Sequence, residues 1–406
     1  MKRFKIPEIY QSSLIKGVHA FRDKTDPRKK DFRATELNFG TLKFIIARSF
    51  GFCYGVENAV ERSYRAVSEN PGKKIYLLSQ MIHNPDVNAD LLSQGIRFIM
   101  DTSGNQLIDW DEITSEDIVI IPAFGTSIET KELLASKGIE FKTYDTTCPF
   151  VTRVWKRAEQ LGMKNYNLII HGKYNHEETK ATFSHSLQNA EAIVIKDMKE
   201  AKILADFVKG NMSKAEFNTI FKGKFSANFD PEIHLEHVGV INQTTMLATE
   251  TSEIAEYISV VYKEKYGSSY KNHIADTRDT LCYATNENQD STIEMLKNKA
   301  DIAIVVGGYN SSNTSHLVEL CEEKLPSYYI ANASEIKSES EVHHYNFRTK
   351  EMHTTTDFLK GNSKIMITCG ASCPDSVLNE VIEKIVGFYS EVSTNEEALK
   401  NLQILS

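Results

Sequence analysis

The sequence lacks any apolar run near the roughly 18 residues that a membrane-spanning helix requires, which argues against an integral membrane protein. The basic start, Met1-Lys-Arg-Phe-Lys5, is followed by no apolar segment of the secretory type. Acidic residues such as Glu8 and Asp23 argue against a transit peptide. We therefore expect a cytoplasmic protein with no membrane partner.

An excess of positive charge is also missing. The 406 residues include 47 lysines and arginines against 55 aspartates and glutamates, which gives a formal net charge of −8 at pH 7. Nucleic-acid-binding domains are usually basic, so no nucleic-acid partner is expected. The G-K-[ST] end of a P-loop is absent as well, which excludes that phosphate-binding motif.

Cysteine is scarce, with six residues and no C-x-x-C pair. Because no secretory signal is apparent, a reducing compartment is expected, with thiols that are reduced or metal-bound. Local spacing therefore gives no support to a metal site. Any such site must be assembled from loops that lie far apart in the sequence.

What the sequence does contain, from residue 42 onward, is an alternation of short apolar runs and helical patterns. The alternation predicts an α/β protein with mostly parallel sheets covered on both faces. Ligands of such sheets bind beyond the carboxyl ends of the strands, so the loops that follow strands are the places to search. The expected strands are Phe44–Ala47, Ile75–Leu78, Ile118–Ile121, Phe141–Tyr144, Leu168–Ile170, Ile193–Ile195, Val238–Ile241, Ile302–Val306, Tyr328–Ile330 and Ile365–Ile367.

Three segments depart from this alternation of apolar runs and helical patterns. Residues 1–41 are polar and are expected to form a surface arm or a partly disordered leader. Residues 209–235 show no clear period and are interpreted as an insertion. The tail, 390–406, has a weak helical pattern and is expected to be a docked or frayed end.

Cys53, Cys148 and Cys282 each follow a predicted strand or loop and precede a helix. A thiolate at a helix N-terminus is favoured by the helix dipole, and thiolates are ligands of zinc and iron–sulfur clusters. A single such cysteine is more often a small buried residue beside turn glycines. The recurrence of one arrangement in three loops favours a metal site. Cys321 lies in the middle of a predicted helix and is expected in the core. Cys369 and Cys373 could serve a site or simply pack.

Polar side chains cluster in loops that follow strands. The loop His171-Gly-Lys-Tyr-Asn-His-Glu-Glu-Thr179 carries His176 and Glu178, which suit proton transfer, although a solvated charged loop is an equal alternative. The stretch Gly307-Gly-Tyr-Asn-Ser-Ser-Asn-Thr-Ser315 follows an apolar strand and opens a helix, as an anion-binding loop does. A turn with an N-cap is the alternative there. Gly370-Ala-Ser-Cys-Pro-Asp375 repeats the pattern more briefly.

Taken together, these loops resemble the IspH (LytB) family of 4-hydroxy-3-methylbut-2-enyl diphosphate reductases. The resemblance covers roughly residues 42–390 and favours the longer plant and cyanobacterial type. It rests on the following motifs, in this order: GFCYGVENAV, DTTCP, HGKYNHEE, NQTT, DTLCYAT, VVGGYNSSNTSHL and TCGASCPD.

The resemblance implies three α/β domains arranged as a trefoil around an iron–sulfur cluster. The implied boundaries are 54–147, 148–281 with the insertion, and 42–53 together with 282–389. Cys53, Cys148 and Cys282 match the ligands of a [4Fe-4S] cluster with one open iron.

The family reaction implied is the reductive removal of the substrate hydroxyl, which yields isopentenyl and dimethylallyl diphosphate in the last step of the non-mevalonate pathway. Ferredoxin or flavodoxin would supply two electrons one at a time, and Glu178 would deliver protons. His176 and Thr245 complete the implied catalytic set. The implied substrate-binding residues are His83, His176, Thr244, Ser311, Ser312, Asn313 and Ser372.

One position departs from the family pattern. Many bacterial members have histidine where this chain has Phe124, and phenylalanine cannot donate a hydrogen bond to phosphate. Lys173 is a candidate replacement, because a lysine on a flexible stem can reach phosphate without fixed geometry.

Two other classes of function stay open on the sequence alone. In a non-catalytic metal protein, the three cysteines would hold structural zinc or an electron-carrying cluster, and a closed site would need a fourth ligand that the matching loops do not supply. An iron–sulfur hydro-lyase would also use an open iron, but it would need no external electrons.

Overall fold

The computed structural model describes residues 4–275, 280–359 and 364–406. Asp279, the first residue of the DTLCYAT motif, lies outside these ranges. The chain divides into two compact units. The first comprises Met1–Glu61, Ile82–Leu91 and Tyr283–Ser406, and the second comprises Arg62–Met81 and Leu92–Cys282.

The first unit is built on a six-stranded mixed sheet in the order β10-β9-β13-β2-β1-β14. The first four of these strands are parallel neighbours, whereas β1 pairs antiparallel with both β2 and β14. The strands are β1 (Thr35–Asn38), β2 (Lys43–Ile46), β9 (Ile302–Val306), β10 (Ser327–Ile330), β13 (Lys364–Cys369) and β14 (Gln403–Ile404).

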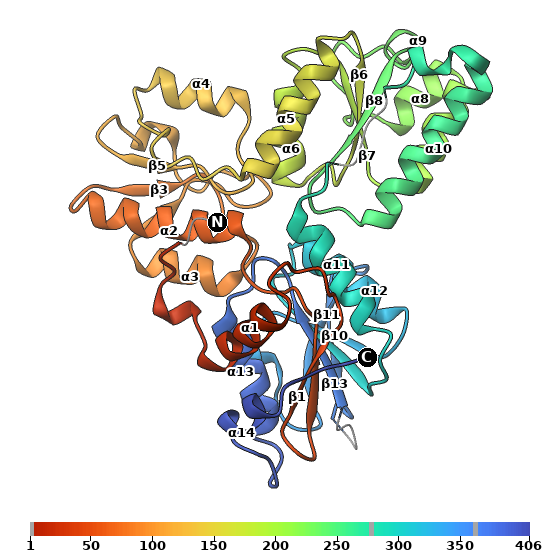
Figure 1. The fold of residues 1–406 in the computed structure, drawn as a ribbon. Helices are drawn as coiled ribbons and strands as arrows, with labels where there is room; N and C mark the ends of the chain where they lie inside the picture. Colours follow the sequence, from red (N-terminus) through yellow and green to blue (C-terminus); the bar gives the residue numbers. More distant parts are fainter. Residues whose placement is uncertain (1–3, 276–279, 360–363) are drawn as a thin grey trace. The chain divides into compact units, whose positions relative to one another are not determined.

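Helices cover both faces of this sheet (Figure 1). Side chains alternate between the faces of a strand, so Phe44 and Ile46 pack with α1 (Ser13–Thr25) and α13 (Asp375–Val386). Ile45 points to the opposite face and packs with residues of α11 and α12. These two helices are α11 (Tyr283–Met295) and α12 (Ser312–Glu322). Burial on both faces explains why these strands are apolar throughout.

The N-terminal segment corrects one expectation. It is neither a surface arm nor a disordered leader, because it forms η1 (Glu8–Tyr10), α1 and β1. Leu14, Ile15 and Val18 of α1 are buried in the core of the first unit. The ring of His19 stacks on Phe50 in the loop that carries Cys53, with centroids 4.6 Å apart.

The C-terminal tail is docked, as one reading of its pattern predicted. It forms α14 (Asn395–Lys400) and β14, and Ala398 is fully buried. A hairpin of β11 (Val342–Asn346) and β12 (Glu351–Thr355), preceded by η4 (Ala333–Glu335), was not predicted. The residues of β11 are mostly half-buried and those of β12 mostly exposed, and neither strand has the apolar run that identifies a fully buried strand.

The second unit contains two separate three-stranded parallel sheets. The first has the order β4-β3-β5. The elements around it are α2 (Tyr54–Glu69), β3 (Ile75–Leu77), α3 (Pro85–Ser93), β4 (Ile96–Phe98), η2 (Trp110–Glu112), β5 (Ile118–Ile120) and α4 (Ile128–Ser136), with α2 and α3 continuing from the first unit.

The predicted strand Phe141–Tyr144 is wrong. The segment forms turns, and only Asp145 makes an isolated bridge, with Ile121. The Glu140 carboxylate accepts the N–H of Thr143 at 3.1 Å, so a side chain takes the place of a strand partner.

The other sheet of the second unit has the order β7-β6-β8. Residues of α5 pack on one face, and residues of α7, α8 and α10 pack on the other. The insertion 209–235 is therefore structured, and its Phe217 and Phe221 belong to this core. The elements are α5 (Pro149–Gly162), β6 (Asn167–His171), α6 (Glu177–Ser186), β7 (Ala192–Ile195), α7 (Met198–Val208), α8 (Lys214–Ile220), α9 (Pro231–His234), β8 (Val238–Asn242), α10 (Ala248–Tyr266) and η3 (Gly267–Asn272).

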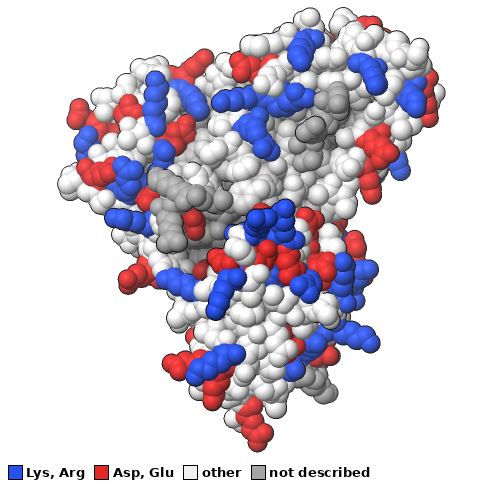
Figure 2. Space-filling view, viewed as in Figure 1, with Lys and Arg blue, Asp and Glu red and all other residues white. Residues whose placement is uncertain are grey.

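Among the helices that the described residues form, none has the length and apolar character of a membrane span. Figure 2 shows lysine and arginine side chains interspersed with aspartate and glutamate side chains over the face drawn. Both signs of charge therefore occur together on this face.

Candidate functional site

Two of the predicted thiol ligands lie together in the second unit. Cys148 is the N-cap of α5, which Pro149 begins, and its N–H donates to the carbonyl of Ala123 at 3.0 Å. The N–H of Cys282 donates to the carbonyl of Thr244 at 3.1 Å. The helix after Cys282 starts at Tyr283, earlier than the sequence pattern indicated.

Burial, with a smaller contribution from the neighbouring charges of Cys282 and Glu178, raises the pKa of the Cys148 thiol to about 11. A thiol with this pKa stays protonated at neutral pH unless a cation stabilises the thiolate. A metal ion supplies that stabilisation, because coordinated thiols are deprotonated. The environment of Cys148 therefore fits a thiolate-bound metal cofactor.

The six cysteines fall into two groups. Cys53, Cys148 and Cys282 are partly exposed, and Cys321, Cys369 and Cys373 are buried. Cys321 packs in the hydrophobic core of the first unit, as its position in a helix predicted. Cys369 and Cys373 pack in the core on the other face of the same sheet.

Glu178 is 2% exposed and lies in the first turn of α6. One carboxylate oxygen accepts the N–H of Thr244 at 2.6 Å, and the other accepts the hydroxyl of Thr244 at 2.8 Å. Burial raises the pKa of Glu178 more than the two hydrogen bonds from Thr244 lower it, and the net pKa is about 7. The group is therefore a carboxyl that can hold or release a proton near neutral pH.

His176 is the N-cap of α6, and its Nδ1 accepts the N–H of Glu178 at 3.2 Å. In a neutral imidazole, an accepting Nδ1 leaves the proton on Nε2. The ring of Phe124 meets the ring of His176 edge to face, with centroids 5.6 Å apart. The position at which this chain departs from the family pattern therefore lies beside a predicted site residue.

Gln243 holds the neighbouring loops together, and the sequence analysis did not assign it a role. Its side-chain oxygen accepts the N–H of Lys173 and the hydroxyl of Thr179, both at 3.0 Å. Its side-chain nitrogen donates to the hydroxyl of Thr245 at 2.7 Å. Gln243 therefore orients Thr245. The Lys173 side chain is exposed. Gln243 belongs to the NQTT motif, but the contacts of its side chain with Lys173 and Thr179 could not be seen in the sequence.

A second carboxyl group near the site was also missed. Glu177 precedes Glu178 in α6 and accepts a hydrogen bond from the hydroxyl of Ser79. Burial raises the pKa of Glu177 to about 7 as well. No sequence pattern indicated this pKa shift, because the burial of Glu177 depends on packing against a distant segment.

The first unit holds the remaining predicted residues. The N–H of Cys53 donates to the carbonyl of Ala371 at 3.2 Å, and α2 begins directly after Cys53. Ala371 in turn donates its N–H to the side-chain oxygen of Asn313 at 3.0 Å. The Cys53 loop is thus connected through one residue to the predicted anion-binding loop.

That loop runs from β9 into α12. Ser311 is the N-cap of α12, and its hydroxyl oxygen accepts the N–H of Thr314 at 3.2 Å. Ser311, Ser312 and Asn313 are all at least nine-tenths buried. Among the described residues, no acceptor lies within hydrogen-bonding distance of the Asn313 side-chain nitrogen. An unused buried donor at a helix N-terminus fits an anionic ligand.

Close backbone approach brings His83 and Ser372 to the same loop. The hydroxyl of Ser372 donates to the carbonyl of His83 at 3.2 Å. A Cβ atom on Gly308 would lie 2.2 Å from that same carbonyl oxygen, so only glycine fits there. The residues predicted to bind the diphosphate in the first unit are therefore neighbours in space.

Comparisons with known proteins show the family of the chain. The family model described as LytB protein matches residues 44–386. The 4-hydroxy-3-methylbut-2-enyl diphosphate reductase of Trichormus variabilis is 39% identical over 378 residues, 93% of this chain and 89% of that protein. The enzyme of the same name from Gloeothece citriformis is 37% identical over 386 residues, 95% of this chain and 91% of that protein.

Solved structures give the same result. The chain is similar to a structure of (E)-4-hydroxy-3-methyl-but-2-enyl diphosphate reductase, described as the terminal enzyme of the non-mevalonate pathway, with a TM-score of 0.52 and 25% identity over 85% of this chain and 99% of that one. The corresponding reductase from Plasmodium falciparum, at 21% identity and a TM-score of 0.61, covers 85% of this chain and 87% of its own and supports the fold. The chain belongs to the LytB protein family.

Proposed function

We propose that this protein is a 4-hydroxy-3-methylbut-2-enyl diphosphate reductase. The reaction breaks the carbon–oxygen bond of the substrate hydroxyl, which leaves as water, and forms a new carbon–hydrogen bond. It consumes two electrons and two protons and yields isopentenyl or dimethylallyl diphosphate. The observation that carries the proposal is the buried Glu178 carboxyl, with a pKa raised to about 7 beside Cys148, in a chain of this family.

Glu178 holds the proton. At neutral pH a substantial fraction of its carboxyl is protonated, and Thr244 keeps the group oriented through both carboxylate oxygens. Thr245, oriented by Gln243, is the polar neighbour assigned to the substrate hydroxyl. His176 carries its proton on Nε2 and can donate it to an anionic oxygen.

The diphosphate is held by hydrogen-bond donors of the first unit. The α12 N-terminus with Ser311 and Ser312, and the side-chain nitrogen of Asn313, supply hydrogen bonds in the first unit. His83 and Ser372 complete this set. Lys173 stays a candidate for the contact that Phe124 cannot make, since its exposed side chain is long and flexible.

Cys53, Cys148 and Cys282 would be the thiolate ligands of a [4Fe-4S] cluster. When bound, this group supplies electrons one at a time and an open iron for the substrate oxygen. Ferredoxin or flavodoxin is the proposed electron donor. A reducing, cytoplasmic compartment suits a chain whose cysteines form no disulfide within the described residues.

The experiment that tests the function is anaerobic turnover of 4-hydroxy-3-methylbut-2-enyl diphosphate with a reduced one-electron donor. We expect isopentenyl and dimethylallyl diphosphate, and no product without the donor. A non-catalytic metal protein would give no turnover, and a hydro-lyase would not consume electrons. Either result would replace the proposal.

The cluster assignment has its own test. Cys148→Ser should lower iron and sulfide content and abolish turnover, whereas Cys321→Ser should change neither. The second variant is the matched control, because Cys321 is a buried core residue. Normal iron and sulfide content in Cys148→Ser would remove Cys148 from the ligand set.

A further inference from the structure

A second group of metal-binding side chains lies in the second unit, apart from the cysteine loops in the sequence. Glu236 and His237 directly precede β8, and His273 follows η3. Each of the three offers a ligand atom within 4.8 Å of those of the other two. The backbone fixes this proximity, because the N–H of Val238 donates to the carbonyl of His273 at 2.9 Å.

In both imidazoles one ring nitrogen is fixed by a backbone carbonyl. The Nδ1 of His237 lies 2.9 Å from the carbonyl oxygen of Asn272, and the Nδ1 of His273 lies 3.1 Å from that of Glu236. A carbonyl only accepts, so each Nδ1 carries the hydrogen, and in the neutral ring the Nε2 lone pair is left for a metal. Such Nδ1–H bonds to carbonyls fix ring orientation at known metal sites.

Aromatic neighbours hold the two rings in place. The His237 and His273 rings are stacked, with centroids 4.8 Å apart and an interplanar angle of 11°. Tyr266 stacks on His273, with centroids 3.6 Å apart, and Tyr166 meets His237 edge to face. A metal ion lies close to the plane of each imidazole that binds it, so at least one of these near-parallel rings must turn out of the stack when both bind the same ion.

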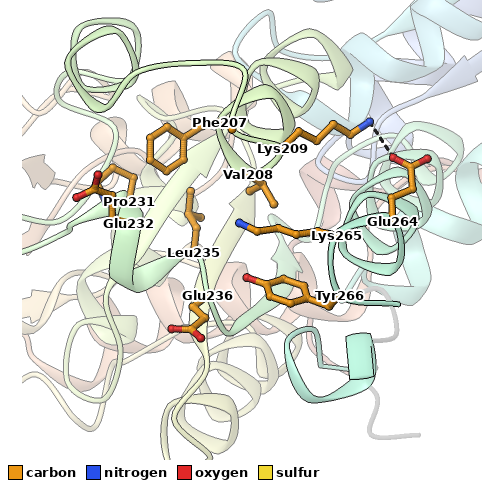
Figure 3. A pocket seen from close by; sticks show the side chains of 11 residues that line it. Phe207, Val208, Lys209, Pro231, Glu232, Leu235, Glu236, Glu264, Lys265 and Tyr266 are labelled. Atoms are coloured by element: carbon orange, nitrogen blue, oxygen red, sulfur yellow. Dashed lines mark ion pairs between the residues drawn. The ribbon is translucent and has the colours of Figure 1, made fainter. Parts of the chain in front are cut away.

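Of the three residues, Glu236 also lines a pocket of about 520 Å³. Figure 3 shows Glu236 and Tyr266 side by side at one end of this pocket, with Lys265 pointing into it. Glu236 is exposed and the two histidines are partly exposed. A hydrated metal ion can therefore reach the three side chains without any rearrangement of the core.

We propose that Glu236, His237 and His273 bind a divalent transition metal of the zinc class, with water in the remaining positions. Two imidazoles and one carboxylate suit zinc better than magnesium or calcium, which prefer oxygen ligands. At bond lengths of about 2.1 Å, tetrahedral ligands lie about 3.4 Å apart, so the three groups close in by up to about 1.4 Å. The exposed Glu236 side chain has room for this movement.

The metal ties the segment after η3 to the start of β8. These segments are otherwise joined by an isolated β-bridge between Val238 and Ile274. In addition, the N–H of Ala275 donates to the carbonyl of Val238 at 2.8 Å. Bound zinc is therefore expected to stabilise the folded protein, since it binds the native arrangement of residues distant in sequence.

The test is an anaerobic calorimetric titration of the cluster-loaded protein with zinc chloride. We expect one zinc ion per chain with a dissociation constant of about 1 µM or tighter. Affinity should fall at least about a hundredfold in the double variant His237→Ala/His273→Ala and about tenfold in Glu236→Gln. His353→Ala, which removes an exposed histidine of β12, should leave the titration unchanged.

Far-UV circular dichroism checks that the variants fold, and the single variant His273→Gln replaces the double variant if that one does not. Cobalt chloride provides a second readout, because an absorption band from a tetrahedral cobalt site should appear in the parent protein and not in the variants. Zinc affinity that is equal in the parent and in every variant, or no binding at all, would overturn the proposal.

Discussion

At the scale of single residues, Glu178 shows how burial and hydrogen bonding act in opposite directions on one carboxyl group. Removal from water raises its pKa, and the N–H and hydroxyl of Thr244 lower it. Burial has the larger effect, so the group titrates close to neutral pH. An exposed glutamate would be ionised there and could not deliver a proton.

Glu178→Gln keeps the shape of the side chain and an acceptor for the N–H of Thr244 but removes the titratable proton. We expect turnover to fall at least about a hundredfold, the low end for general acid catalysis, with normal cluster content and substrate affinity. In the parent protein, turnover should decline as the pH rises through about 7, because Glu178 then loses its proton. Near-normal turnover in the variant would make His176 the next candidate for proton donor.

At the scale of elements, the buried strands could be predicted and the polar ones could not. Strands such as β9 are covered on both faces, so their sequence is continuously apolar and easy to identify. The exposed β12 carries no such signal. The helix α1 was overlooked because only a narrow stripe, with Leu14 and Val18, is apolar in an otherwise polar segment.

The same contrast applies to the candidate site. The glycine- and serine-rich loop before α12 was predicted from its pattern of strand, turn and helix. The residues that orient the site, such as Gln243 and Ser79, depend on contacts between segments far apart in sequence. No local pattern encodes those contacts.

The loop between β9 and α12 depends on Gly308. In Gly308→Ala, the new Cβ would lie 2.2 Å from the carbonyl oxygen of His83, so the two backbones must separate. We expect the dissociation constant for the diphosphate substrate to rise tenfold or more, with iron content unchanged. The matched control is Gly387→Ala, whose Cβ would meet no atom closer than 3.4 Å and whose φ is −63°. Equal affinities in both variants would contradict a role for this loop in binding.

The helix α1 should behave as part of the core. Ile15 is fully buried, so Ile15→Ala leaves a cavity and should lower the free energy of unfolding by about 2–5 kcal/mol. Ile9 is 58% exposed, so Ile9→Ala should change it by less than about 0.5 kcal/mol. Urea unfolding followed by circular dichroism measures both. If the two substitutions had the same small effect, α1 would not be packed as described.

At the scale of the whole molecule, the order of motifs carried more information than any local spacing. No C-x-x-C pair suggests a metal site, yet motifs distributed from residue 42 to 390 identified the family that the match over residues 44–386 establishes. The proposed ligands Cys53, Cys148 and Cys282 are far apart along the chain. A cofactor bound by all three would therefore cross-link distant segments.

Such a cross-link should stabilise the folded protein, because it removes the entropy of two long loops from the unfolded chain and binds only the native arrangement. We therefore expect the cluster-free protein to unfold at a temperature at least about 2 °C below that of the cluster-loaded protein. Anaerobic thermal unfolding followed by circular dichroism measures the difference, and rebuilding the cluster with iron and sulfide should restore it. The difference should persist in Cys321→Ser and disappear in Cys148→Ser, which cannot retain the cluster. Identical unfolding temperatures for the loaded and cluster-free parent protein would mean that the cofactor does not link these segments.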